Sequence, residues 1–268
     1  MNDRSSSNNI LDRIVLAAEK RMVAIPARPD LEEAAHAAVD RRRTEGLRSL
    51  RQTLAAPGPQ ILAECKHASP SAGILRAPFD PVALARAYEA GGAAAISVVV
   101  EPEFFLGDPD WIPEVRMAVA LPVLRKDFIV SERQLYETAL LGADAVLLIQ
   151  RLLTRERTAM LLDLARELEL EVLLEIFVDE DPAAAIDSGA EILGVNARNL
   201  ATFETSVDRV IELGRALPAD RVRVAESGIK GHDDIIRLTK AGYGAFLIGE
   251  ALVRSEDSGQ AVAELVGR

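Results

Sequence analysis

Residues 122–149 read PVLRKDFIVSERQLYETALLGADAVLLI and hold one complete strand–helix–strand unit. The apolar runs at 122–126 and 145–149 have the length of buried strands, and the segment 131–143 between them has the apolar spacing of an amphipathic helix. Two strands joined by such a helix lie parallel in one sheet, because the crossover returns the chain to the same end. The unit therefore predicts an α/β fold with a parallel sheet.

The same unit repeats on both sides of residues 122–149. Further apolar runs of strand length are ILAEC (61–65), AAAISVVV (93–100), EVLLEI (171–176), EILGVN (191–196), RVRVAES (221–227) and AFLIGE (245–250), which makes eight in all. Amphipathic segments separate them, and SGQAVAELVGR (258–268) follows the last. Eight repeats predict a (β/α)8 TIM barrel. The alternative, an open doubly wound sheet, usually carries a G-x-G-x-x-G motif after its first strand, and KHASPSAG here lacks it.

The residues before the first run have helical spacing. ILDRIVLAAEKRMVA (10–24) and DLEEAAHAAVDRRRTEGLRSLRQTL (30–54) predict helices, the arginines at 41–43 are expected on a solvated helix face, and APGP (56–59) ends the segment. We expect a single barrel domain over residues 1–268, of which residues 1–59 are an N-terminal helical extension.

Composition excludes several classes of partner. The chain has 268 residues with 31 basic and 42 acidic side chains, so its net charge is −11, which disfavours broad binding to nucleic acid. Cys65 stands alone, so no internal disulfide forms, and no Cys/His cluster has zinc-ligand spacing. Neither a secretory signal nor an apolar run of about 18 residues is present, so we expect a cytoplasmic protein without a membrane partner.

Charged residues stand where the predicted strands end, which is the active-site end of this fold. Period two places Glu64 and Lys66 on one face of the first strand and Cys65 on the other, toward the outer helices. The other strand-end candidates are Lys126, Glu175, Asn196, Arg198 and Glu226. Together they predict a site for an anionic substrate in which a lysine and a carboxylate transfer protons; the alternative is that they serve only as internal ion pairs.

The last two strands end in small residues. Ser227 and Gly228 follow the seventh, and Gly249 and Glu250 end the eighth. The loops after strands seven and eight frequently hold a phosphate in this fold, so we expect a phosphate there. His67 is expected either near that phosphate or facing solvent.

The ordered motifs of the chain resemble one enzyme family. They are ILDRIV, AECKHASPSAG, EFFLGD, PVLRKDFIV, GADAVLLI, LLEIF, LGVNARNL, VAESGI and FLIGEALV, and over nearly the whole chain they are similar to indole-3-glycerol phosphate synthase. The resemblance implies a carboxy-lyase of tryptophan biosynthesis that closes the ring of 1-(2-carboxyphenylamino)-1-deoxyribulose 5-phosphate, with loss of CO₂ and water and with no cofactor or metal.

The resemblance also implies roles for single residues. Lys126 is the general acid, and Glu175 and Lys66 take part in proton transfers. The remaining implied catalytic and substrate-binding residues are Glu64, Asn196, Ser69, Phe128, Arg198 and Glu226, and Phe128 with Leu147 can supply an apolar slot. The implied phosphate-binding residues are Ser227, Gly228, Gly249 and Glu250.

The chain departs from the family pattern at three places. The usual KKASPSKG reads KHASPSAG at 66–73, the usual LTD reads VVE at 99–101, and NxRDL has Asn199 in place of its acid. These changes weaken the positive rim. They leave open a paralogue that acts on a ring-substituted substrate. A silent barrel that binds a phosphorylated ligand is a second alternative, which the intact Lys66, Lys126 and Glu175 disfavour. A phosphoribosylanthranilate isomerase-like enzyme is a third; it would need a Cys/Asp acid–base pair at early strand ends, and Cys65 is expected on the wrong face. A monomer is compatible with the sequence.

Overall fold

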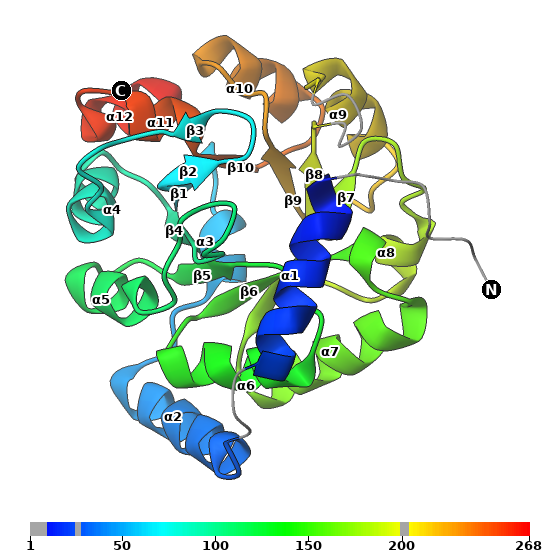
Figure 1. The fold of residues 1–268 in the computed structure, drawn as a ribbon. Coiled ribbons are helices and arrows are strands. Elements are labelled where there is room, and N and C mark those ends of the chain that lie inside the picture. Colours follow the sequence, from blue (N-terminus) through cyan, green and yellow to red (C-terminus); the bar gives the residue numbers. More distant parts are fainter. Residues whose placement is uncertain (1–9, 25–27, 199–203) are drawn as a thin grey trace.

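Eight parallel strands close into a barrel in the computed structural model, which describes residues 10–24, 28–198 and 204–268 (Figure 1). The strands follow one another round the barrel in chain order, and the last pairs with the first. The predicted (β/α)8 barrel is confirmed. Its strands are β1 (Gln60–Cys65), β4 (Ala95–Val99), β5 (Val123–Lys126), β6 (Ala145–Ile149), β7 (Glu171–Phe177), β8 (Ile192–Asn196), β9 (Val222–Glu226) and β10 (Ala245–Ile248).

Helices surround the barrel and connect its strands, as Figure 1 shows. They are α4 (Pro81–Ala90), α5 (Trp111–Ala118), α6 (Glu132–Leu141), α7 (Arg155–Glu167), α8 (Ala183–Asp187), α9 (Val207–Gly214), α10 (His232–Lys240), α11 (Glu250–Arg254) and α12 (Ser258–Leu265). The capping box of Ser131 and Gln134 starts α6, and Gly142, with φ 83°, ends it. No helix in the described part of the chain is long and apolar enough to cross a membrane.

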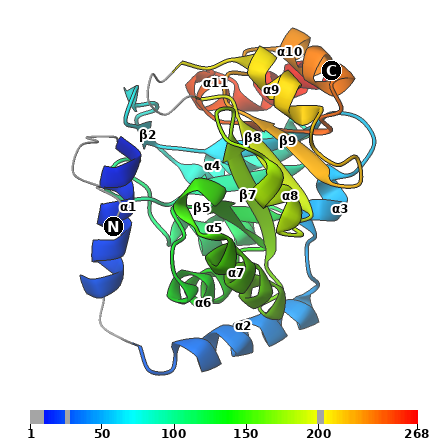
Figure 2. The same cartoon turned by 90° about the vertical axis from the view of Figure 1, so that its right-hand side faces the viewer.

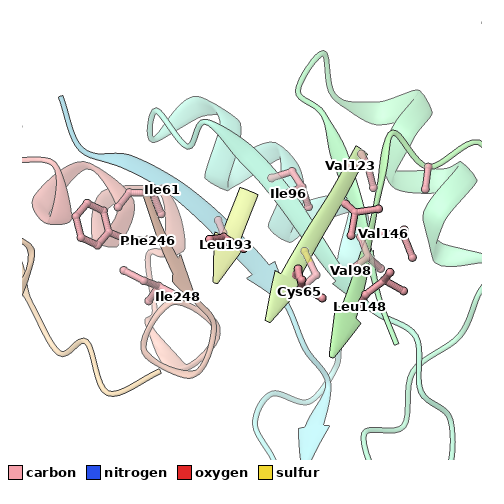
Figure 3. Close-up of a cluster of buried hydrophobic side chains, with 14 of the residues drawn as sticks. Ile61, Cys65, Ile96, Val98, Val123, Val146, Leu148, Leu193, Phe246 and Ile248 are labelled. Carbon is pink, nitrogen blue, oxygen red and sulfur yellow. The ribbon is translucent and has the colours of Figure 1, made fainter. Parts of the chain in front are cut away.

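The strands bury two separate apolar layers because alternate side chains point to opposite faces. Inward residues such as Leu62, Leu124 and Leu173 fill the barrel, and outward residues pack against the helices. Figure 3 shows part of the outer layer, where Cys65 lies beside Val98. Cys65 is fully buried there, so its predicted outward orientation is confirmed.

Three helices precede the barrel: α1 (Ile10–Ala24), α2 (Leu31–Glu45) and α3 (Leu50–Leu54). Helix α1 lies across the end of the barrel where the strands terminate, and α3 lies at the opposite end (Figures 1 and 2). Leu50 and Leu54 of α3 are buried against the inner apolar layer, so α3 closes the bottom of the barrel. That residues 1–59 belong to the same domain as the barrel stays a prediction.

The prediction of a solvated face for the arginines at 41–43 holds at Arg41 and Arg43, which are exposed, and is wrong at Arg42. Arg42 does not lie on a solvated face: its side chain is 5% exposed, Nη2 donates to the Glu169 carbonyl at 2.9 Å, and the same atom is 3.9 Å from Asp144. The segment between β7 and β8 forms a helix only from Ala183. Glu180 accepts the backbone N–H of Phe177, and this turn delays the helix.

Candidate active site

A cavity of about 530 Å³ opens at the carboxyl ends of the strands, beneath α1. All fourteen residues predicted for the site line it. They are Glu64, Lys66, Ser69, Lys126, Phe128, Leu147, Glu175, Asn196, Arg198, Glu226, Ser227, Gly228, Gly249 and Glu250. The barrel therefore brings together residues that are far apart in the sequence.

Lys126 lies at the centre of a group of buried carboxyls. Its Nζ is 3.3 Å from Glu175 Oε2 and 3.6 Å from Glu226 Oε2. Burial by itself disfavours the charged ammonium, but the charges of Glu175, Glu226 and Glu64 outweigh it and raise the pKa of Lys126 above its ordinary value. Lys126 therefore carries a proton at neutral pH, as a general acid has to.

A second lysine–carboxylate pair lies on β1 and the residue after it. Lys66 Nζ is 2.6 Å from Glu64 Oε1, and the side chain of Glu64 is 2% exposed. Burial opposes ionisation of Glu64, yet the charges of Lys66 and Lys126 and the Lys66 hydrogen bond lower its pKa below the usual value. Glu64 thus remains ionised inside the cavity.

Glu226 differs from the other acids. Its side chain is 1% exposed, and neither carboxyl oxygen has a hydrogen-bond partner among the described residues. Burial, followed by the neighbouring charge of Glu175, raises its pKa well above the ordinary value in spite of Lys126. Glu226 therefore ionises less readily than an ordinary glutamate, and Glu175 is the closer acidic partner of Lys126.

Asn196, at the end of β8, orients Glu175 from the other side. Asn196 donates from Nδ2 to Glu175 Oε2 at 3.3 Å and accepts the backbone N–H of Arg198 at 3.0 Å. Arg198 Nη1 reaches Ser71 Oγ at 3.5 Å, on the loop that follows β1. Asn199, which departs from the family pattern, lies outside the described residues.

One wall of the cavity is apolar. Phe128 and Leu147 are on it as predicted, and the ring of Phe105 lies 6.0 Å from that of Phe128. Leu11 and Ile14 of α1 cover the same space and are almost completely buried. The family resemblance implies that the N-terminal segment covers the mouth of the site, but Leu11, Ile14 and Phe105 were not predicted individually, because an apolar stripe on a helix does not indicate which of its residues will line a cavity.

The ends of β9 and β10 form the opposite wall. Ser227 and Gly228 have φ of 65° and 72°, so two successive residues adopt the left-handed conformation. Successive backbone N–H groups in such a turn can converge on an anion. Lys230 also lines the cavity and adds a cation that sequence reasoning did not single out.

His67 does not line the cavity, and its side chain is partly exposed to solvent. Its ring stacks on Phe79 at a centroid distance of 4.9 Å, and Nδ1 lies 3.3 Å from the Leu106 carbonyl. Trp111 packs on the same Phe79 ring, at the start of α5. Within the described residues, no group of three or more His, Cys, Asp or Glu side chains is placed to hold a metal ion.

Comparison with known proteins gives the family. The family described as "Indole-3-glycerol phosphate synthase" matches residues 11–265. The chain belongs to the indole-3-glycerol phosphate synthase family. It is similar to the indole-3-glycerol phosphate synthase of Albidiferax ferrireducens, with 42% identity over 96% of this chain and 98% of that protein. It is also similar to that of Lachnoclostridium phytofermentans, with 46% identity over 77% of this chain and 76% of that protein. The predicted family is confirmed.

Solved structures of other enzymes share only the fold of this family member. A mutant tryptophan synthase alpha-subunit from Pyrococcus furiosus superposes with a TM-score of 0.60 at 15% identity, over 79% of this chain and 98% of that one. Thiamine phosphate pyrophosphorylase from the same organism gives 0.59 at 17% identity, over 81% of this chain and 96% of that one.

Proposed function

We propose that this chain is an indole-3-glycerol phosphate synthase, acting in the cytoplasm on 1-(2-carboxyphenylamino)-1-deoxyribulose 5-phosphate. The family supports this function over a ring-substituted substrate and over a silent barrel. The outward, buried Cys65 speaks against the isomerase-like alternative, which needs that thiol in the cavity. The observation that carries the proposal is the position of Lys126 Nζ, 3.3 Å from Glu175 Oε2, in a cavity with one apolar wall.

The first step forms the new ring. The aromatic carbon that bears the carboxylate attacks the ketone carbon, and the carbonyl π electrons move to its oxygen. Lys126 donates its proton to that oxygen, so a hydroxyl forms instead of an alkoxide. Phe128, Leu147 and Phe105 hold the aromatic ring against the apolar wall, which keeps the attacking carbon near the ketone.

Loss of CO₂ and of water completes the reaction. The carbon–carboxylate bond breaks, and its electrons restore the ring. The hydroxyl then leaves as water. A proton is removed from the adjacent ring carbon, so that the carbon–carbon double bond of the new five-membered ring forms. Glu175 accepts that proton and Lys66 protonates the leaving hydroxyl, since both line the cavity next to Lys126 and Glu64. The products are indole-3-glycerol phosphate, CO₂ and water, and the balance needs no redox partner.

The phosphate would rest at the ends of β9 and β10. We expect backbone N–H groups of Ser227, Gly228 and Gly249 to bind it, and Lys230, which lines the same cavity, to supply a positive charge. Glu250 contributes its backbone, because its side chain pairs with Arg254 at 3.0 Å.

The test is a direct assay of product. Purified chain is mixed with the carboxyphenylamino substrate, and the fluorescence of the indole product is followed with time. Turnover of this substrate supports the proposal. Binding without turnover would support the silent barrel, and turnover of only a ring-substituted analogue would support the paralogue.

A further inference from the structure

We propose that Arg21 is a positioning residue that fastens α1 over the cavity by joining it to two buried acids beside the site. Its Nη1 is 3.2 Å from Glu101 Oε1, and its Nη2 is 3.4 Å from Asp127 Oδ1. The inference rests on the proposed function, because the groups that Arg21 holds in place are those of that site. It goes beyond that function by giving a role to a residue that touches no reacting atom.

Glu101 organises the loop after β4. It is fully buried, and its carboxylate accepts the backbone N–H groups of Glu103, Phe104 and Phe105 at 3.1, 2.7 and 3.1 Å. Phe105 lines the apolar wall of the cavity. Through Glu101, Arg21 thus connects α1 to the loop that places this ring.

Asp127 connects Arg21 to the end of β5. It stands between Lys126 and Phe128, which both line the cavity, and its side chain is 3% exposed. Its Oδ2 accepts from Arg125 Nη2 at 2.9 Å, and its Oδ1 accepts the N–H of Phe128 at 2.9 Å. Arg125 therefore holds Asp127 from within the outer layer, while Arg21 holds it from the helix above.

The two ion pairs of Arg21 favour the position of α1 over the cavity. Without Arg21, Glu101 loses its ion-pair partner and Asp127 keeps only Arg125. A buried carboxylate without a counter-ion is unfavourable, so both acids favour the observed position of α1, in which Arg21 reaches them. The start of the helix makes separate contacts: Leu11 and Ile14 cover the cavity, and Arg13 lies 5.5 Å from the centroid of the Phe104 ring.

The test compares Arg21→Gln with Lys20→Gln. Lys20 is the neighbouring residue on the same helix and is exposed, so its variant removes the same charge without the two contacts. Arg21→Gln is expected to raise KM about tenfold, the equivalent of one lost hydrogen bond between charged groups, with kcat changed less than about threefold. Lys20→Gln should keep KM within about twofold, and Arg21→Lys should recover part of the loss.

Hydrogen exchange gives a measurement that needs no substrate. Arg21→Gln should speed exchange of the amides of Phe104 and Phe105, while Lys20→Gln should not. Unchanged exchange, or faster exchange with unchanged KM, would overturn the role of Arg21. A wild-type chain that does not turn over the substrate would instead overturn the proposed function, and the exchange result would still decide whether Arg21 fastens the loop.

Discussion

Lys126 Nζ and Glu175 Oε2 lie 3.3 Å apart although they belong to β5 and β7, which are separated by β6. The contact crosses β6 at the carboxyl ends of the strands, so it depends on the order of the strands in the sheet and not on local sequence. The negative charge of Glu175 raises the pKa of Lys126. Lys126 and Glu175 are therefore close enough to contact the same substrate molecule.

Glu175→Gln should lower kcat by about 10²–10⁴-fold, because the amide fills the same space and cannot accept a proton. Asn196 can still contact the amide, so substrate binding should be retained. The measurement is steady-state kinetics together with the Kd of a reduced, non-reactive substrate analogue. A variant with near wild-type kcat would show that another group takes the proton.

Glu226 should make stability depend on pH. Its folded-state pKa lies above the ordinary value of 4.5, so folding favours the protonated form. The stabilisation is complete below that ordinary value and is lost as pH rises through the raised folded pKa. Glu226→Gln cannot ionise, so its free energy of unfolding should improve relative to wild type as pH increases. Urea unfolding at pH 5, 7 and 8 measures this; a difference that stays constant with pH would contradict it.

Gly249→Ala should impair the site more than a single methyl suggests. A Cβ at this position would overlap Glu64 Oε1 and would lie 3.1 Å from Lys66 Nζ. The ion pair would have to move, so KM and kcat should both worsen, by about tenfold or more. Gly244→Ala, at the other end of the same strand, is the control, since its Cβ meets only the Leu54 carbonyl, at 3.9 Å. Equal kinetics for the two variants would contradict a contribution of the Glu64–Lys66 pair to the site.

Removal of residues 1–55 should abolish activity and reduce solubility. The cut removes Leu11 and Ile14 from the cavity and Leu50 and Leu54 from the bottom of the barrel. Deletion of one buried leucine side chain already costs about 2–5 kcal/mol, so urea unfolding should show a large loss of stability. A truncated protein with full activity would mean that the segment is a dispensable tail.

The sequence predicted the barrel well because strand spacing and strand-end chemistry are local signals. The run at 145–149 coincides with β6, and period two placed Glu64 and Lys66 in the cavity and Cys65 outside it. Since all strands are parallel, every strand end meets at one opening. Residues found one strand at a time therefore fell in one site.

The remaining features depend on tertiary contacts that no local pattern encodes. Arg42 belongs to a basic run, yet its burial depends on carbonyl groups near residue 169. His67 follows Lys66, yet Phe79 takes its ring away from the cavity. The contact of Arg21 with Glu101 spans 80 residues, so helical spacing alone could not reveal it.

The most direct measurement is the kcat of Lys126→Met in the indole fluorescence assay. Methionine keeps the apolar stem but removes both the proton donor and the charge. Loss of general acid catalysis is typically worth about 10²–10⁴-fold, so kcat should fall by at least about 10³-fold with a much smaller change in KM. A variant that retains more than about a tenth of wild-type kcat would contradict the assignment of Lys126 as the general acid.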